Sequence, residues 1–185
     1  MNNPENFQPT SSVEAEYLPH VAYGPVRSQE VMERIVGSEV RMLGHVGIKD
    51  TVLVEQSLSD VTDVGDPSPQ DVLEGVVNPD SFRSLGAVSN QDSQESGIGG
   101  TLFALTPEQK ARLDAYELVP EGWFERTQVD VVHPNGEVQR AETHVLSGEY
   151  QASRQVKDEE QHPLAGEEKA KLLRSIDRYN DSIGQ

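Results

Sequence analysis

The pattern of hydrophobic and polar positions divides the chain near Tyr17. Residues 1–16 are polar and acidic and contain almost nothing to bury, so we expect a flexible arm. Apolar residues become frequent after this point. Val21-Ala22-Tyr23 has the character of the end of a buried strand, which Gly24 closes. Ordered structure is therefore expected to begin at about residue 17.

A helix and two strands are predicted next. Residues 29–36 predict a helix because Ser28 is a suitable N-cap, Gly37 is a suitable stop, and the apolar residues share one face. Those apolar residues are Val31, Met32, Ile35 and Val36. Residues 40–46 and 51–55 have the pattern of strands.

Residues 57–97 break this regular pattern. They are rich in Ser, Asp, Gly, Pro and Asn, and only residues 72–77 and 82–88 have an orderable pattern. So long an irregular segment is uncommon in a compact domain unless it is functional or mobile. We therefore expect an irregular insertion here.

Regular elements return in the second half. Residues 100–105 predict a strand, and Thr106-Pro107-Glu108-Gln109 predicts a capping-box start for a helix that runs to about Tyr116. Residues 127–133 and 137–146 predict a hairpin around Pro134-Asn135-Gly136. The last part, residues 151–185, is an expected charged helical extension with a helix over about 166–183. Its narrow apolar stripe consists of Leu172, Leu173, Ile176 and Tyr179.

Composition narrows the possible functions. The chain has 185 residues, of which 35% are hydrophobic and 5% aromatic, which suits one domain with solvated tails. Its net charge of −17 argues against nucleic acid and anionic membrane surfaces as partners. The absence of cysteine excludes disulfides and thiolate chemistry. With neither a secretory signal pattern nor an apolar stretch of membrane-spanning length, we expect a soluble cytoplasmic protein.

One acidic residue, Glu117, has the surroundings of a proton-transfer group. It ends the predicted helix on the same face as Leu113 and Tyr116, and Trp123 and Phe124 follow directly after a turn. Apolar surroundings of this kind raise the pKa of a carboxyl group toward neutrality. The alternative is a solvated glutamate that merely ends a helix. Asp114, one turn earlier, is expected to face solvent or to cap locally.

These residues resemble the γ-glutamylcyclotransferase family, and its AIG2-like branch in particular. The resemblance rests on strand-Tyr-Gly-x-x-Arg at residues 23–27 and on Leu-Asp-x-Tyr-Glu-x-x-Pro-Glu-Gly-aromatic-aromatic-x-Arg at residues 113–126. It spans about residues 17–146 and is weakest across 57–97, and the barrel domain that it implies covers residues 17–150. It implies an α+β fold, a small mixed β-barrel with flanking helices and a substrate pocket at one mouth. It also implies cyclisation of a γ-glutamyl amine or peptide to 5-oxoproline, without a metal or organic cofactor.

The resemblance assigns roles to particular residues. Glu117 corresponds to the catalytic acid and base, and the turn from Tyr23 to Arg27 corresponds to the backbone N–H donors that hold substrate oxygens. Trp123 and Phe124 are the expected aromatic walls of the substrate site. Pro25 departs from the family pattern, because proline has no N–H to donate. Either Gly24, Val26 and Arg27 supply the donors, or the barrel is catalytically silent and binds a small ligand or a protein.

The side chains around these motifs admit two interpretations each. Arg27 is predicted either to pair with a substrate carboxylate or to form a structural ion pair. Tyr23 either donates its hydroxyl to substrate or is a core tyrosine, and Arg126 is expected to be structural or to line the pocket. The histidines lack metal-binding spacing, although His133 and His144 are expected to face each other across the hairpin. Oligomeric state does not follow from the sequence.

Overall fold

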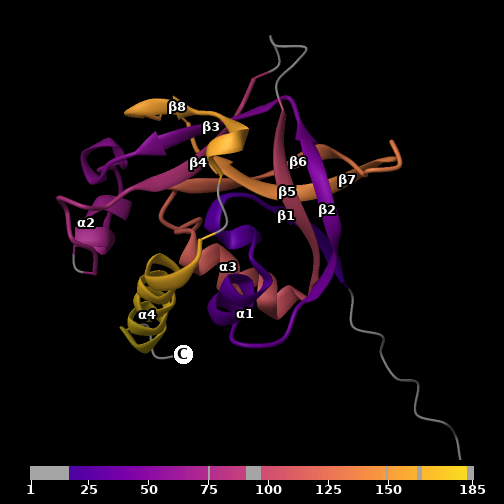
Figure 1. Ribbon diagram of the computed structural model, residues 1–185. Coiled ribbons are helices and arrows are strands. Elements are labelled where there is room, and N and C mark those ends of the chain that lie inside the picture. The colour runs from indigo at the N-terminus through magenta and orange to yellow at the C-terminus, as the bar shows by residue number, and fades with distance from the viewer. Residues whose placement is uncertain (1–16, 75, 91–96, 149, 162–163, 183–185) are drawn as a thin grey trace, which may run out of the picture.

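The computed structural model describes residues 17–74, 76–90, 97–148, 150–161 and 164–182. Five strands close into a small barrel in the order β1-β5-β2-β6-β7 (Figure 1). They are β1 (Leu18–Ala22), β2 (Arg41–Lys49), β5 (Gly97–Leu105), β6 (Phe124–Val132) and β7 (Val138–Leu146). Neighbouring strands are antiparallel except β1 and β7, which meet in parallel at His20 and Glu142. The predicted mixed barrel is therefore confirmed.

A second sheet of three strands lies beside the barrel (Figure 1). It has the order β4 (Ser84–Ser89), β3 (Thr51–Gln56) and β8 (Arg154–Val156), and β4 pairs with β3 over its whole length. Within the predicted irregular insertion over 57–97, the two stretches with an orderable pattern, 72–77 and 82–88, overlap α2 (Pro69–Glu74) and β4, respectively. The serines and the glycine of β4 give this segment a weak intrinsic preference for strand conformation, and its pairing with β3 stabilises the strand.

Three helices cover one side of the barrel, and their ends follow the sequence signals. In α1 (Gln29–Val36), Gly37 takes the left-handed conformation with φ of 70°. In α3 (Pro107–Tyr116), the Thr106 hydroxyl oxygen accepts a hydrogen bond from the Gln109 N–H, and the Gln109 side-chain oxygen accepts one from the Thr106 N–H. The third helix, α4 (Gly166–Ser182), contacts α1. None of the helices in the described part of the chain combines the length and apolar composition needed to cross a membrane.

The apolar stripe of α4 packs on the helices of its own chain. Ile176 is fully buried in the cluster that α1 and α3 build against the barrel, and Leu172 and Leu173 pack against the same cluster. The segment 151–185 is more than a helical extension, however. It contributes β8 to the second sheet and a short 3-10 helix, η3 (Asp158–Glu160). The predicted arm at 1–16 lies outside the described residues.

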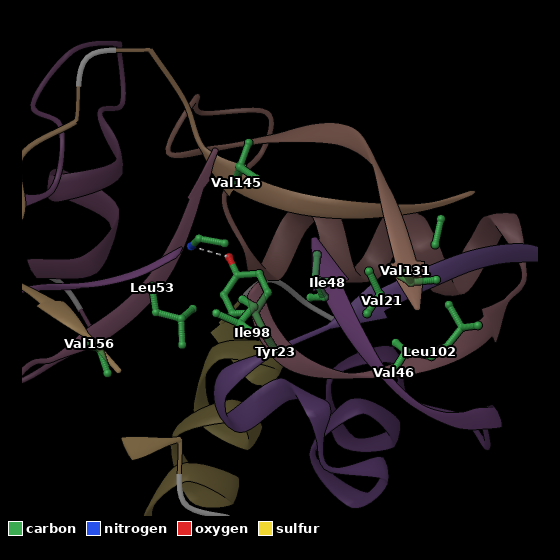
Figure 2. Close-up of a cluster of buried hydrophobic side chains, with 12 residues drawn as sticks. Val21, Tyr23, Val46, Ile48, Leu53, Ile98, Leu102, Val131, Val145 and Val156 are labelled. Atoms are coloured by element: carbon green, nitrogen blue, oxygen red, sulfur yellow. Dashed lines mark hydrogen bonds between the residues drawn. The ribbon is translucent and has the colours of Figure 1, made fainter. Parts of the chain in front are cut away.

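One apolar cluster joins the strands of the barrel to those of the second sheet, and Figure 2 shows it with Tyr23 among its members. Gly100 is required where β5 passes β1, because a Cβ at this position would lie 2.9 Å from the main-chain oxygen of Ala22. The cluster itself contains Val21, Tyr23, Val46, Ile48, Leu53, Ala87, Ile98, Leu102, Val131, Ala141, Val145 and Val156. This rigid interior fixes the ends of β1 and β7, which reach the site described next.

Candidate active site

A cavity of about 620 Å³ lies between the barrel and the elements around it. It is lined by β1 with the turn that follows it, by the last turn of α3 and by β7. Leu73, residues in the range 76–85 and α4 line it as well. This volume is in the range of sites that hold small organic ligands.

Glu117 lines this cavity at the C-terminal end of α3. Leu113 and Tyr116 line it as well, so the face predicted from the helical spacing is the face that the cavity exposes. Within the described residues the Glu117 carboxyl has neither a hydrogen-bond donor nor an ion-pair partner. Burial raises its pKa to about 7, with Asp114 adding to the rise and Lys110 opposing it. Glu117 can therefore both accept and donate a proton near neutral pH.

Asp114 belongs to a buried charge network beneath Glu117, so the expectation that it faces solvent is wrong. The Lys110 ammonium lies 2.6 Å from Asp114 Oδ1, 2.8 Å from Glu142 Oε1 and 2.8 Å from His144 Nε2. Arg126 forms a further ion pair with Asp114, which is a structural role. Burial alone would raise the pKa of Asp114, but hydrogen bonds with His144, Arg126 and Lys110 outweigh it and hold that pKa well below its usual value.

Two histidines line the cavity, although neither was predicted to belong to the site. The rings of His20 and His144 meet edge to face with centroids 5.1 Å apart. Burial lowers the pKa of both, so each imidazole is neutral at pH 7, and the buried Nδ1 of His20 has no hydrogen-bond partner in the structure as described. His144 does not face His133, because its partner across the hairpin is Arg126.

The turn after β1 offers fewer donors than the resemblance implies. Residues Gly24–Arg27 form a 3-10 helix, and such a helix has no internal acceptor for an N–H at its first two positions, here Gly24 and Pro25. The Gly24 N–H donates to Gln161 Oε1 at 2.7 Å, and Pro25 has no N–H. Both orphan positions are therefore closed to a ligand in this conformation. The Arg27 guanidinium donates to the main-chain oxygen of the same Gln161.

The remaining predicted substrate contacts divide into two groups. Glu117, Tyr23, Pro25, Val26 and Trp123 line the cavity, whereas Gly24, Arg27 and Phe124 are not among the residues that line it. Phe124 is instead buried in the cluster beneath β3 and β4. Hence only part of the predicted set is brought together at one site.

Two of the aromatic side chains have polar groups that the fold itself satisfies. The Tyr23 hydroxyl donates to the His144 main-chain oxygen and accepts from the Ala87 N–H, each at 2.9 Å, and Figure 2 shows the second of these bonds. The Trp123 indole donates to Gln56 Oε1 at 2.9 Å. Tyr23 is thus a core tyrosine, and Trp123 contributes an apolar wall.

Two further groups of residues line the cavity and were not predicted from the sequence. One consists of Leu73, Val76, Val77, Phe82, Arg83 and Leu85, and the other, from α4, consists of Lys171, Leu172, Arg174, Arg178 and Tyr179. The basic residues of α4 recur at helical spacing, a local signal that was available. No group of three metal-ligating side chains occurs among the residues that the structure describes.

We expect Gln161→Leu to lower the free energy of unfolding by about 1–3 kcal/mol, because buried polar groups lose their partners. Gln161 is 4% exposed, and its amide also donates to the Gly99 main-chain oxygen at 3.3 Å. Urea denaturation measures this change. Gln155→Leu, at an exposed position of β8, is the matched control and should alter stability by less than about 0.5 kcal/mol. Equal effects of the two substitutions would contradict the role of the Gln161 side chain as partner of the Gly24 N–H and the Gly99 oxygen.

Comparison with solved structures establishes the fold of the chain. No protein-family model matches the sequence, and no curated protein matches it at a significant level. A solved gamma-glutamyl cyclotransferase superposes with a TM-score of 0.57 at 13% identity, over 85% of this chain and 86% of that one. An uncharacterised human protein gives the same TM-score and coverage at 14% identity. A protein from Arabidopsis thaliana gives 0.50 at 13% identity, over 94% and 93%.

These similarities extend over nearly the whole chain, and at such identities they define the architecture. The chain therefore has the γ-glutamylcyclotransferase-like fold, as the resemblance in its motifs implied.

Proposed function

We propose that this protein is a γ-glutamylcyclotransferase-like enzyme that converts a γ-glutamyl amine or peptide into 5-oxoproline and releases the amine. The observation that carries the proposal is the Glu117 carboxyl, which lines the cavity unpaired among the described residues and has a pKa of about 7. A solved structure named gamma-glutamyl cyclotransferase shares the fold and supports the same activity.

The proposed reaction needs proton transfers that one carboxyl group can perform. The ionised Glu117 takes a proton from the α-ammonium of the γ-glutamyl group, and the free amine then attacks the γ-carbonyl carbon of the same molecule. A new C–N bond closes the five-membered ring, the original amide C–N bond breaks, and Glu117 returns the proton to the leaving amine. Nucleophile and electrophile belong to one molecule, so the reaction consumes no water and needs no cofactor. The cavity walls hold the chain in a folded-back conformation for this attack.

The test is release of 5-oxoproline when the wild-type protein is incubated with γ-glutamyl amines and γ-glutamyl dipeptides. We expect the activity to rise with pH through about 7, because Glu117 must be ionised to accept the first proton. Chromatographic detection of 5-oxoproline at pH 5 to 9 gives this profile. Absence of product from every γ-glutamyl compound would refute the proposal.

A second candidate is a binding module with the same fold and no catalysis. It is favoured by Pro25 and by the Gly24 N–H, which Gln161 already occupies. In that case the turn cannot stabilise the oxyanion of a transition state, and a ligand binds without reacting.

Pro25→Thr separates the two candidates. For an active enzyme we expect less than a tenfold change in the rate of 5-oxoproline release, because other groups already hold the substrate oxygens. A missing oxyanion donor costs about 10²–10³ in rate, so a gain of that size would show that proline had disabled the turn. Steady-state kinetics of both proteins at pH 8 decide between these outcomes.

A further inference from the structure

The charged residues that line the cavity are mostly basic, whereas those of the whole chain are mostly acidic. Among the described residues that line it, four are basic and only Glu117 is acidic. The chain as a whole has 15 basic and 32 acidic residues. A strongly acidic protein thus concentrates positive charge at this one cavity. The four basic residues are Arg83, Lys171, Arg174 and Arg178.

Three of these cations form a row on α4. Lys171, Arg174 and Arg178 are spaced at i, i+3 and i+7, which places them on one face of the helix. The row extends over about 10 Å at the helical rise of 1.5 Å per residue. It is therefore long enough to meet more than one anionic group of an extended ligand.

The protein itself neutralises this row only weakly. Lys171 lies 3.5 Å from Glu167, but both side chains are largely exposed, and pairs of this kind contribute little. Arg174 has no ion-pair partner among the described residues. Asp177 of the same helix instead pairs with Arg34 of α1. The positive charge of the row remains available to a ligand.

The row starts beside the end of α3 that carries Glu117. Next to Arg178, the Tyr179 hydroxyl donates to the Ala115 main-chain oxygen at 2.7 Å, and the Tyr179 ring meets the Tyr116 ring edge to face. If the γ-glutamyl group reacts at Glu117, the part of the substrate that leaves extends along the row. Apolar side chains, among them Phe82 and Leu172, line the same cavity. Such walls suit the methylene groups of a long amino-acid chain.

We infer that α4 and Arg83 bind the leaving half of the substrate, and that this half carries two or more carboxylates, as in a γ-linked chain of glutamates. This inference rests on the proposed function. A γ-linked oligomer presents an α-carboxylate on every unit and a further γ-carboxylate on its last unit, and its first unit is itself a γ-glutamyl amide. Cyclisation of that unit releases 5-oxoproline and a chain one unit shorter, whose new α-amine accepts the proton from Glu117. No further reactant is required.

Binding to the full-length Glu117→Gln protein tests the inference without turnover. Calorimetry is performed with γ-glutamylpropylamine, γ-linked diglutamate and γ-linked triglutamate. We expect affinity to rise along this series by about tenfold overall, since each further carboxylate adds an exposed ion pair of modest strength. The gain should disappear at high salt, which screens exposed charges. Equal affinities for the three ligands would overturn the inference.

Two variants and one further ligand test whether the gain in affinity comes from α4. Introducing Arg174→Gln into the Glu117→Gln protein should remove part of the gain in affinity for γ-linked triglutamate and leave the affinity for γ-glutamylpropylamine unchanged. Arg140→Gln is the matched control, because Arg140 is an exposed arginine of β7 that pairs with Asp130 and does not line the cavity. An equal loss in both variants would refute a specific role for α4. Triglutamate with ordinary α-peptide bonds should bind more weakly than the γ-linked form, and equal binding would contradict the choice of γ-linked chains.

The inference and the proposed function fail in different ways. Tight binding of γ-linked triglutamate to Glu117→Gln, with no 5-oxoproline from the wild type, would refute the enzyme and retain the binding site. Release of 5-oxoproline at equal kcat/KM from all three compounds would retain the enzyme and refute the role of the cations.

Discussion

Glu117→Gln is expected to reduce the rate of 5-oxoproline release by about 10²–10⁴-fold, the usual contribution of a general acid–base group. Glutamine has nearly the same shape but cannot exchange a proton at neutral pH. The loss should appear in kcat with little change in KM, because the substitution removes proton transfer rather than cavity volume. Steady-state assays of the wild type and the variant at pH 8 measure it.

Glu125→Gln is the matched control for this substitution. Glu125 is an exposed residue of β6, eight positions further along, and its change should leave the rate within about twofold. If Glu117→Gln retained the wild-type rate as well, Glu117 would have no part in the chemistry.

The same carboxyl group also links stability to pH. Its pKa in the folded protein, about 7, lies above the ordinary value of 4.5, so the folded state retains a proton that the unfolded state has lost. The resulting stabilisation is complete below about pH 4.5 and is lost as pH rises through 7. Glu117→Gln should therefore be more stable than the wild type above pH 7, by up to about 3 kcal/mol. Thermal unfolding at pH 5 and 8 provides this second readout, which is independent of any substrate.

Asp114→Asn is expected to lower the free energy of unfolding by about 3–5 kcal/mol, because it leaves the buried Lys110 ammonium without its nearest counter-charge. Lys110 and Asp114 are both nearly inaccessible, at 2% and 4% exposure, so water cannot replace the lost interaction. Urea denaturation at pH 7 measures the change.

An exposed ion pair, that of Asp130 with Arg140, provides the control for this substitution. Asp130→Asn removes an exposed partner of Arg140 and should cost no more than about 1 kcal/mol. The pKa of Asp114 is depressed in the folded protein, so its contribution is present above the ordinary value of 3.8 and is lost as pH falls below it. The difference between wild type and Asp114→Asn should therefore shrink below about pH 4. A difference that stayed constant down to pH 2 would contradict the ionic role.

Local signals were sufficient for the elements that carry Glu117. The capping box of Thr106 and Gln109 fixes where α3 starts, and the spacing of Leu113, Tyr116 and Glu117 fixes which face carries the acid. These features depend on residues three or four positions apart, so a sequence states them directly. The fold was implied by the family resemblance of the motifs at residues 23–27 and 113–126 together.

Features that depend on distant pairing did not follow from the sequence. Asp114 was expected to face solvent or to cap locally, because its own helix does not show what β7 places beneath it, namely Glu142 and His144. Residues 82–88 were expected to be orderable, but only pairing with β3 defines β4 as a strand. In both cases the deciding partner belongs to an element remote in sequence.

The helices, the hairpin and the position of Glu117 at a helix end follow from signals along the chain, and the fold follows from the resemblance of its motifs. The surroundings of that acid depend on the assembled molecule. Tertiary contacts bring the cations of α4 to the same cavity, bury Asp114 with Lys110, and pair the Gly24 amide with Gln161, a residue 137 positions away. The physical reason is that helix caps and helical faces follow from neighbours along the chain. Burial and charge pairing depend instead on which remote segments the closed barrel brings into contact.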